Sequence, residues 1–252
     1  MLASSITLPF KNRLLAVLPP IVQARLLPLL EFIPLPLGSV LYEPGDPLHY
    51  VYFPIDAIVA LMSVTESGAS LGHLVIGNEG LVGVSVFMGG ESTPSRAIVQ
   101  SAGSTYRIAG PRLKHEFNGN GELLQLVLRY TQSMIIQIAQ TAVCNRHHSI
   151  DSQLCRILLM SLDRIQGNKL VLTQELIASI LGVRREGITD AAGKLQSLGA
   201  MEYSRGRITV LDRSKLEALS CECYAVVKEE TDRLLPYELL ARAQSRRAVQ
   251  HS

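Results

Sequence analysis

Two adjacent arginines and a glutamate, Arg184, Arg185 and Glu186, have the chemistry needed to recognise the edges of DNA bases. A guanidinium can donate two hydrogen bonds to O6 and N7 of guanine, and a carboxylate can accept one from N4 of cytosine. These residues stand at the start of a predicted helix, whose N-terminal end could enter the major groove. The candidate DNA-binding residues are Thr173, Gln174, Arg184, Arg185, Glu186, Thr189, Lys194, Ser204, Arg205 and Arg207.

A helix, a tight turn and a second helix are predicted to position these side chains. Thr173 can cap the first helix, because its hydroxyl can accept from a backbone N–H one turn further on. Gly182 permits a sharp turn, since glycine takes a positive φ without steric cost. The second helix is expected from about residue 183 to residue 198, with Gly199 as its stop. Its inward face is expected to consist of Ile188, Ala191, Ala192, Leu195 and Leu198.

Two short β-prone runs follow, at residues 201–203 and 208–211. Arg205 and Arg207 lie on the predicted hairpin, where they could meet DNA phosphates. Helix, turn, helix and basic hairpin together predict a winged helix-turn-helix. The alternative is a helical hairpin packed on a core, with the arginines merely facing water. The agreement between Gly182, the paired arginines and the basic hairpin favours DNA binding.

The composition of the 252-residue chain is that of a folded protein, with 47% hydrophobic and 18% charged residues. The net charge is only +2, so DNA affinity would depend on local rather than overall basicity. No apolar run reaches the roughly 20 residues of a membrane span. The first residues lack the basic start and clean apolar block of a secretory signal. We therefore expect a cytoplasmic protein with no membrane partner.

The four cysteines are Cys144, Cys155, Cys221 and Cys223. Cys221 and Cys223 are too close in sequence for an easy disulfide, and no second ligand pair at metal spacing is evident. Cys144 and Cys155 fall in predicted helices as small core residues. The sequence therefore predicts ordinary reduced thiols and no metal, while a redox role for Cys221 and Cys223 is left open.

The first half of the chain changes from helical pieces to strands. Residues 1–35 are predicted to form short helices broken by prolines. From about residue 38 to residue 109, period-two patterns alternate with turn residues, which predicts a jelly-roll-like β-barrel. The expected strands are residues 40–42, 50–53, 58–64, 71–76, 97–99 and 105–108.

A long helix is predicted from about residue 121 to residue 146, with two apolar stripes. One has the spacing of a coiled-coil seam and consists of Leu124, Leu128, Thr131, Ile135, Ile138 and Ala142. The other consists of Leu123, Val127, Tyr130 and Met134. One stripe can pack on the barrel and the other on a second copy, which predicts a homodimer. A fully buried core helix in a monomer is the alternative.

Four polar residues, 145–148, suit a hinge after this helix. Adjacent His147 and His148 would point about 100° apart on a helix and bind one ion poorly, so a surface or hinge role is expected. Further helices are predicted at residues 150–165, 213–219 and 223–235. The polar, basic tail at residues 242–252 is expected to fray.

In this order of parts, the chain resembles the Crp/Fnr superfamily of bacterial transcription regulators over residues 26–219. The run GSVLYEPGD at residues 38–46 is similar to the family's first barrel strands and turn. Residues 173–198 fit its helix-turn-helix. There the resemblance implies that Arg185 and Glu186 are the base-reading pair. Asp190 stands where the family usually carries a third reader, an arginine, so the target sequence departs from the usual one.

The resemblance also places a phosphate-binding cassette at residues 80–97, but its key residues differ. The family's ribose-binding glutamate is Val84 here, and its phosphate-binding arginine falls at Ser95, with Arg96 one place on. A slip of one residue along a strand turns a side chain to the other face. A cyclic nucleotide is therefore not expected. The candidate effector-pocket residues are Gly83, Val84, Ser85, Ser95, Arg96 and Ala97.

No cofactor is evident, and the N-terminal cysteines of the family's iron–sulfur sensors have no counterpart here. The barrel either binds another small molecule or only positions the dimer. The predicted class is α+β: a barrel with leading helices at 1–120, a dimerisation helix and hinge at 121–148, a winged helix-turn-helix at 149–220, and a C-terminal helix and tail at 221–252.

The predicted function is that of a non-enzymatic, sequence-specific transcription regulator. Its expected partners are double-stranded DNA, a second copy of the chain and RNA polymerase. The alternative is a ligand-sensing or protein-interaction module whose DNA-binding half is vestigial. An enzyme is not expected, because the sequence shows no nucleophile–base pair, phosphate loop or metal-ligand set. The sequence does not specify the effector, the operator or the direction of regulation.

Overall fold

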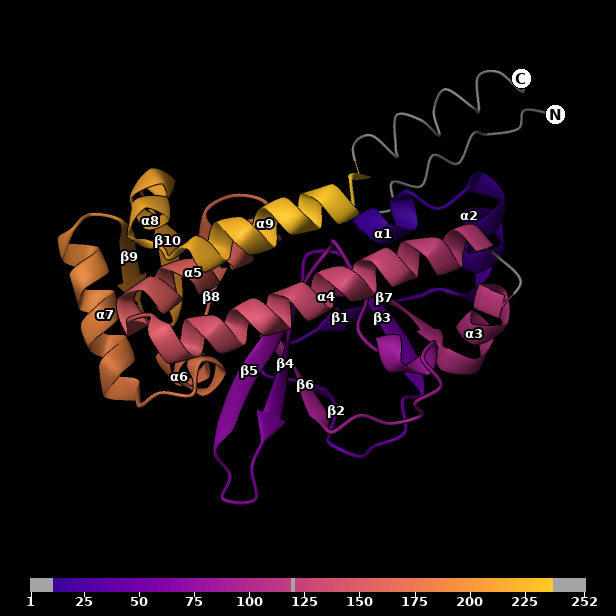
Figure 1. Ribbon diagram of the computed structural model, residues 1–252, viewed down its shortest axis with the longest axis horizontal. Helices are drawn as coiled ribbons and strands as arrows, with labels where there is room; N and C mark the ends of the chain where they lie inside the picture. Colours follow the sequence, from indigo (N-terminus) through magenta and orange to yellow (C-terminus); the bar gives the residue numbers. More distant parts are fainter. Residues whose placement is uncertain (1–10, 119–120, 238–252) are drawn as a thin grey trace.

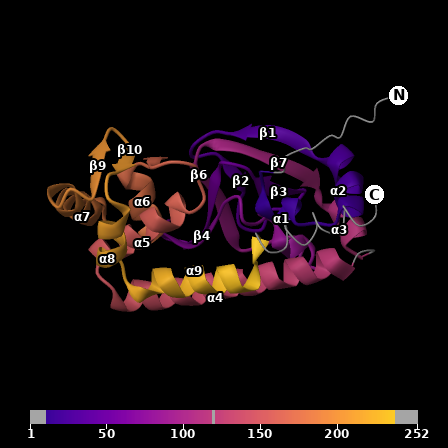
Figure 2. The same cartoon turned by 90° about the horizontal axis from the view of Figure 1, so that it is seen from above.

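The computed structural model describes residues 11–118 and 121–237. Helix α4 (Gly121–His147) runs along the long axis of the molecule, with the β-rich half against one part of it and a smaller helical half at the other end (Figure 1). Seen from above, helix α9 (Glu222–Leu234) lies beside α4 (Figure 2). The predicted α+β class, with N-terminal antiparallel sheets, a long helix and a C-terminal helix-turn-helix, is confirmed.

Two antiparallel sheets make up the β-rich half. The first has the order β1-β7-β3 and the second the order β2-β6-β4-β5. Their bounds are β1 (Glu31–Leu35), β2 (Val40–Tyr42), β3 (Tyr50–Pro54), β4 (Ile58–Val64), β5 (Ser70–Ile76), β6 (Ser95–Ser101) and β7 (Gly103–Ala109). Alternating side chains of the strands fill one apolar core, which includes Val51, Phe53, Val59, Ile76, Val99 and Ile108. The six predicted strands are all present within a few residues of their expected ends.

The prediction of helical pieces throughout residues 1–35 is only partly right. Helices α1 (Arg13–Ala16) and α2 (Pro20–Leu26) and the 3-10 turn η1 (Leu27–Leu29) are present, but β1 is a strand. Its Pro34 breaks the usual strand pattern, and β1 accommodates it because it is an edge strand, where one side of the ladder is free. Residues 1–10 and the predicted tail at 242–252 lie outside the described residues.

Helix α4 buries one of its two predicted stripes. Leu123, Val127, Tyr130 and Met134 face the barrel, and the Tyr130 hydroxyl donates to the carbonyl of Leu81 at 2.8 Å. The other stripe faces outward, with Leu128 52% and Ile135 60% exposed. The single chain therefore leaves an apolar face of α4 without cover.

The remaining helices precede or follow α4 in the chain. A helix missed by the prediction, α3 (Gly110–Asn118), precedes α4, and α5 (Ile150–Leu162) is three residues shorter than expected. Ser149 is the N-cap of α5, since its hydroxyl accepts from the backbone N–H of Ser152 at 3.3 Å. Helix α8 (Arg213–Leu219) has its predicted bounds, and α9 begins and ends one residue early. Among the described helices, none combines the length and hydropathy that a membrane span requires.

Candidate nucleic-acid interface

Helices α6 (Gln174–Leu181) and α7 (Arg185–Ser197) form the predicted helix-turn-helix. The Thr173 hydroxyl accepts from the backbone N–H of Leu176 at 3.2 Å, which caps α6 as predicted. Gly182 has a φ of +65°, the left-handed conformation that ends α6 and starts the turn. Helix α7 buries the small and branched side chains on its inner face, Ile188, Ala191, Ala192 and Leu195. Leu198 does not join them as expected, because α7 ends at Ser197 and the leucine is 53% exposed.

Arg184, Arg185 and Glu186 are all exposed at the N-terminus of α7. Among the described residues, none forms an ion pair with these three side chains. The backbone N–H groups at a helix N-terminus also favour anions such as phosphate. The site therefore has two free guanidinium groups at a position suited to the edge of a duplex.

Two further candidates in the helix-turn-helix have partners within the chain. The Thr189 hydroxyl lies 3.1 Å from Oε1 of Gln174 and 3.2 Å from the carbonyl of Arg185, so it joins α7 to the start of α6. The Lys194 ammonium lies 2.9 Å from the carboxylate of Asp151 in α5. Thr189 and Gln174 therefore orient the two helices, and Lys194 is paired with Asp151.

The predicted wing is a hairpin of β9 (Met201–Ser204) and β10 (Arg207–Val210). Its two turn residues, Arg205 and Gly206, have φ values of +49° and +76°, typical of a tight hairpin turn. Ser204, Arg205 and Arg207 are exposed. A third strand that was not predicted, β8 (Lys169–Val171), pairs with the other edge of β10 and holds the wing to the domain.

Residues 152–219 match the family model for the Crp-like helix-turn-helix domain. Three solved structures share the fold of the chain. FixK2 from Bradyrhizobium japonicum is 14% identical, with 76% of this chain and 98% of that chain covered and a TM-score of 0.63. The transcriptional regulator TTHA1359 of the CRP/FNR family, from Thermus thermophilus, is 20% identical, with 75% and 98% covered and a TM-score of 0.60. The c-di-GMP responsive global regulator CLP from Xanthomonas campestris is 17% identical, with 75% and 97% covered and a TM-score of 0.59.

The chain has the fold of a Crp/Fnr regulator. The fold that the resemblance implied is therefore confirmed, and its DNA-binding part is matched over residues 152–219. Two of these three solved structures are of proteins described as regulators, and the matched domain is a Crp-like helix-turn-helix. No curated protein matches the sequence.

The predicted effector residues of this Crp/Fnr fold lie in two segments. Gly83, Val84 and Ser85 form the start of the 3-10 turn η2 (Val84–Val86), while Ser95, Arg96 and Ala97 open β6. Arg96 donates from Nε to the Glu43 carboxylate at 2.7 Å. In the described parts of the chain, no hydrogen bond joins the two segments. The Arg96 guanidinium, the positive charge of the predicted pocket, is therefore already paired with Glu43.

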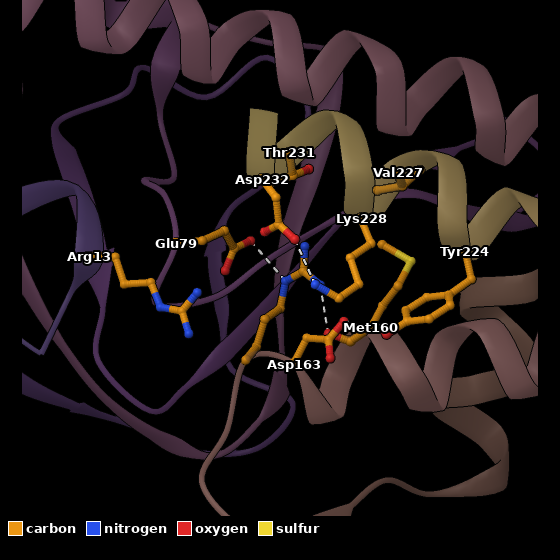
Figure 3. Close-up of a pocket in the computed structure, with 10 residues that line it drawn as sticks. Arg13, Glu79, Met160, Asp163, Tyr224, Val227, Lys228, Thr231 and Asp232 are labelled. Carbon is orange, nitrogen blue, oxygen red and sulfur yellow. Dashed lines mark hydrogen bonds and ion pairs between the residues drawn. The ribbon is translucent and has the colours of Figure 1, made fainter. Parts of the chain in front are cut away.

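A cavity of about 150 Å³ lies elsewhere, between α9, α5 and the turn after β5 (Figure 3). It is lined by Arg13, Glu79, Met160, Asp163, Arg164, Tyr224, Val227, Lys228, Thr231 and Asp232. Four of its charged side chains pair with one another, Arg164 with Glu79 at 2.8 Å and Lys228 with Asp232 at 2.7 Å, and Asp163 pairs with Arg213 at 2.7 Å. Binding sites for small molecules usually exceed about 300 Å³. The cavity therefore belongs to the junction between the two halves.

Four residues that were predicted to have separate roles meet at the C-terminal end of α4: Cys144, His148, Cys221 and Cys223. Their sulfur and nitrogen ligand atoms all lie within 4.8 Å of one another. Cys144 Sγ is 3.5 Å from Cys221 Sγ, and Cys223 Sγ is 3.6 Å from Nδ1 of His148. The expectation that Cys221 and Cys223 lack a second ligand pair is therefore wrong. Cys144 in the last turn of α4 and His148, directly after the helix, supply it.

Sequence reasoning missed this cluster because its two ligand pairs flank the whole helix-turn-helix domain. The available signal was a Cys-x-x-x-His at the end of one helix and a Cys-x-Cys at the start of another. Burial raises the pKa of the Cys144 thiol to about 12. Cys155 is buried in the core, as predicted, and lies outside the cluster.

Proposed function

We propose that this chain is a sequence-specific transcription regulator that binds double-stranded DNA as a homodimer. The observation that carries the proposal is the exposure of Arg184, Arg185 and Glu186 at the start of α7, within the Crp-like domain. Exposed guanidinium groups with no internal ion pair are available to guanine edges and phosphates. A vestigial module, the alternative, would not need to keep them free.

The proposed roles follow from the position of each side chain. Arg185 and Glu186 read base edges, and Arg184 and Thr189 assist them. Ser204, Arg205 and Arg207 on the wing hold the sugar–phosphate backbone. Thr173 and Gln174 at the start of α6 approach the backbone on the other side, and Lys194 contributes if it exchanges Asp151 for a phosphate.

The proposed dimer uses the uncovered stripe of α4. The residues of this stripe recur at the spacing of a coiled-coil seam: Leu124, Leu128, Thr131, Ile135, Ile138 and Ala142. Leu128, Ile135 and Ile138 are exposed in the single chain, and Leu124 is half-buried. Pairing two copies would bury this face. It would also place two copies of α7 to read half-sites about 34 Å apart.

The proposal is less specific about the effector, the cellular compartment and the contact with RNA polymerase. The pairing of Arg96 with Glu43, together with Val84 in place of an acceptor, supports the expectation that a cyclic nucleotide is not the effector. The barrel either binds another small molecule or only positions the dimer. As a DNA-binding regulator, the protein would act in the cytoplasm and contact RNA polymerase.

The proposal is tested by selecting bound duplexes from a random pool with the full-length protein, with and without a metabolite extract. We expect the wild type to select one symmetric operator. Arg185→Ala should weaken binding to that operator by about 1–3 kcal/mol and relax the sequence preference at one base pair per half-site. Arg112→Ala, an exposed arginine on α3, is the matched control and should leave selection unchanged. A pool that is not enriched under either condition would identify a vestigial module instead.

A further inference from the structure

The Cys/His cluster at the hinge connects the two ends of the helix-turn-helix domain. Cys144 lies in the last turn of α4 and His148 directly follows the helix, where its backbone N–H donates to the carbonyl of Cys144 at 3.0 Å. Residues four apart on a helix share one face, so both ligand atoms point the same way. Cys221 and Cys223 follow α8 and begin α9. The four side chains therefore meet where the chain enters and leaves the domain.

The spacing of the ligand atoms agrees with a tetrahedral metal site. Zinc bonds of about 2.3 Å to sulfur and about 2.0 Å to nitrogen place neighbouring sulfurs about 3.8 Å apart and sulfur and nitrogen about 3.5 Å apart in a tetrahedron. The Cys144–Cys221 sulfur distance is 3.5 Å, and the distance from Cys223 Sγ to His148 Nδ1 is 3.6 Å. We propose that Cys144, His148, Cys221 and Cys223 bind a single zinc ion that fastens α4 to α9.

A carboxylate lies where it can orient the histidine ligand. Nε2 of His148 is 3.3 Å from a carboxylate oxygen of Glu222. The tautomer that donates its proton to Glu222 leaves the Nδ1 lone pair facing Cys223. Zinc-binding histidines commonly have a carboxylate on their second nitrogen, because it fixes the ring and makes the ligand nitrogen more basic. Glu222 is therefore a positioning residue for the proposed site.

A buried arginine supplies the charge balance. The Arg156 side chain is among the most buried of the described cations, at 3% exposure. It donates to the Thr141 hydroxyl at 2.7 Å, and its Nε has no hydrogen-bond acceptor in the described part of the chain. The salt bridges between described residues do not include it, although a buried cation normally needs a counter-charge. The Arg156 charge acts on the thiols of Cys144 and Cys223, against the burial that raises their pKa values. A zinc ion with three thiolates and one imidazole carries a net negative charge and would meet the need of Arg156 for a counter-charge.

The metal content of the full-length protein, purified under reducing conditions without chelator, tests the proposal directly. Elemental analysis should find about one zinc ion per chain. The metal-free chain should take up Co²⁺ with the thiolate charge-transfer bands of a tetrahedral site. Cys221→Ser and His148→Ala should lose most of the bound metal. His147→Ala, the exposed neighbour of His148, and Cys155→Ala, the buried cysteine outside the cluster, are the matched controls and should retain it.

A positioning variant protects the test against loss of folding. Glu222→Gln removes no ligand, so it should keep the same metal stoichiometry while weakening zinc affinity about 10- to 100-fold. A folded wild-type chain that binds neither zinc nor Co²⁺ would overturn the proposal. So would a Cys144–Cys221 disulfide formed in place of metal, iron accompanied by inorganic sulfide, or metal content that survives substitution of both Cys221 and Cys223.

Discussion

The carboxylate of Glu79 and the guanidinium of Arg164 lie 2.8 Å apart at the junction of the barrel and the helical half. Glu79 belongs to the turn after β5 and also accepts from the backbone N–H of Gly77 at 3.1 Å. Arg164 follows α5 and donates to Oε1 of Gln137 on α4 at 3.4 Å. Both side chains are nearly buried, at 12% and 10% exposure. One ion pair thus connects the barrel, the long helix and the end of α5.

Removing one partner of this pair should be costly. Arg164→Met leaves the Glu79 carboxylate buried without its cation, which we expect to lower the free energy of unfolding by about 3–5 kcal/mol. The double variant Glu79→Leu/Arg164→Met should lose less than Arg164→Met alone, because no unpaired charge remains. Arg25→Met breaks the half-exposed pair with Glu116 and should cost less than about 1 kcal/mol. Urea unfolding of the wild type and the three variants measures each loss in the free energy of unfolding. Equal losses in Arg164→Met and Arg25→Met would contradict the expectation that the buried pair matters more.

The wing and the recognition helix should respond differently to substitution. Arg207→Ala removes a proposed phosphate contact, so the affinity should fall similarly for every duplex. The slope of the logarithm of the binding constant against the logarithm of the salt concentration should become shallower by about one. Arg207 is preferred to Arg205 here, because Arg205 has a positive φ and its replacement would also disturb the turn. Binding to operator DNA and to random DNA, measured across a series of salt concentrations, distinguishes a phosphate contact by Arg207 from base recognition by Arg207. A loss confined to the operator would assign Arg207 to base recognition.

The uncovered face of α4 predicts how the dimer can be broken. Ile135 is 60% exposed in the single chain and central in the proposed seam, so Ile135→Glu should place a charge inside the interface and yield monomers. Gln125→Glu is the control: Gln125 is also exposed, but it lies about 100° around the helix from Leu124. Light scattering after gel filtration should show a dimer for the wild type and the control. A wild-type monomer at the concentration that saturates DNA would exclude this seam.

Features set by neighbouring residues were predictable from the sequence. The Thr173 cap, the Gly182 turn and the ends of β4 and α8 follow from side chains and backbone preferences within a few positions. Strand β1 was missed because Pro34 argues against a strand, and only the sheet order shows that β1 lies at an edge.

Features set by tertiary contacts were not predictable from local patterns. The Cys/His cluster joins two ligand pairs on either side of the whole helix-turn-helix domain. Each pair is visible in the sequence, but neither indicates that the other lies beside it in the fold. Likewise, the ion pair between Lys194 and Asp151 joins α7 to α5, so a lysine expected on the DNA-facing side has an internal partner. The exposure of Arg184 and Arg185, by contrast, follows directly from the apolar face opposite them.

The contact between strand β5 and helix α6 offers a further test of how the two halves are joined. A Cβ added at Gly72 would lie 2.8 Å from Cγ2 of Ile180 and 3.0 Å from the carbonyl oxygen of the same residue. Because that oxygen belongs to the backbone of α6, Gly72→Ala should push the helix away from the barrel.

We expect Gly72→Ala to lower the free energy of unfolding by about 1–3 kcal/mol, the usual cost of overpacking. Amide hydrogen exchange should also quicken across α6, since the helix loses its support on the barrel. Gly193→Ala is the matched control on α7, where an added Cβ meets nothing within 4 Å. It should instead stabilise the chain by about 0.5–1 kcal/mol, because alanine favours a helix interior over glycine. If Gly72→Ala behaved like Gly193→Ala, the close approach of β5 to α6 would not hold in solution, and the Glu79–Arg164 pair would remain as the joint between the halves.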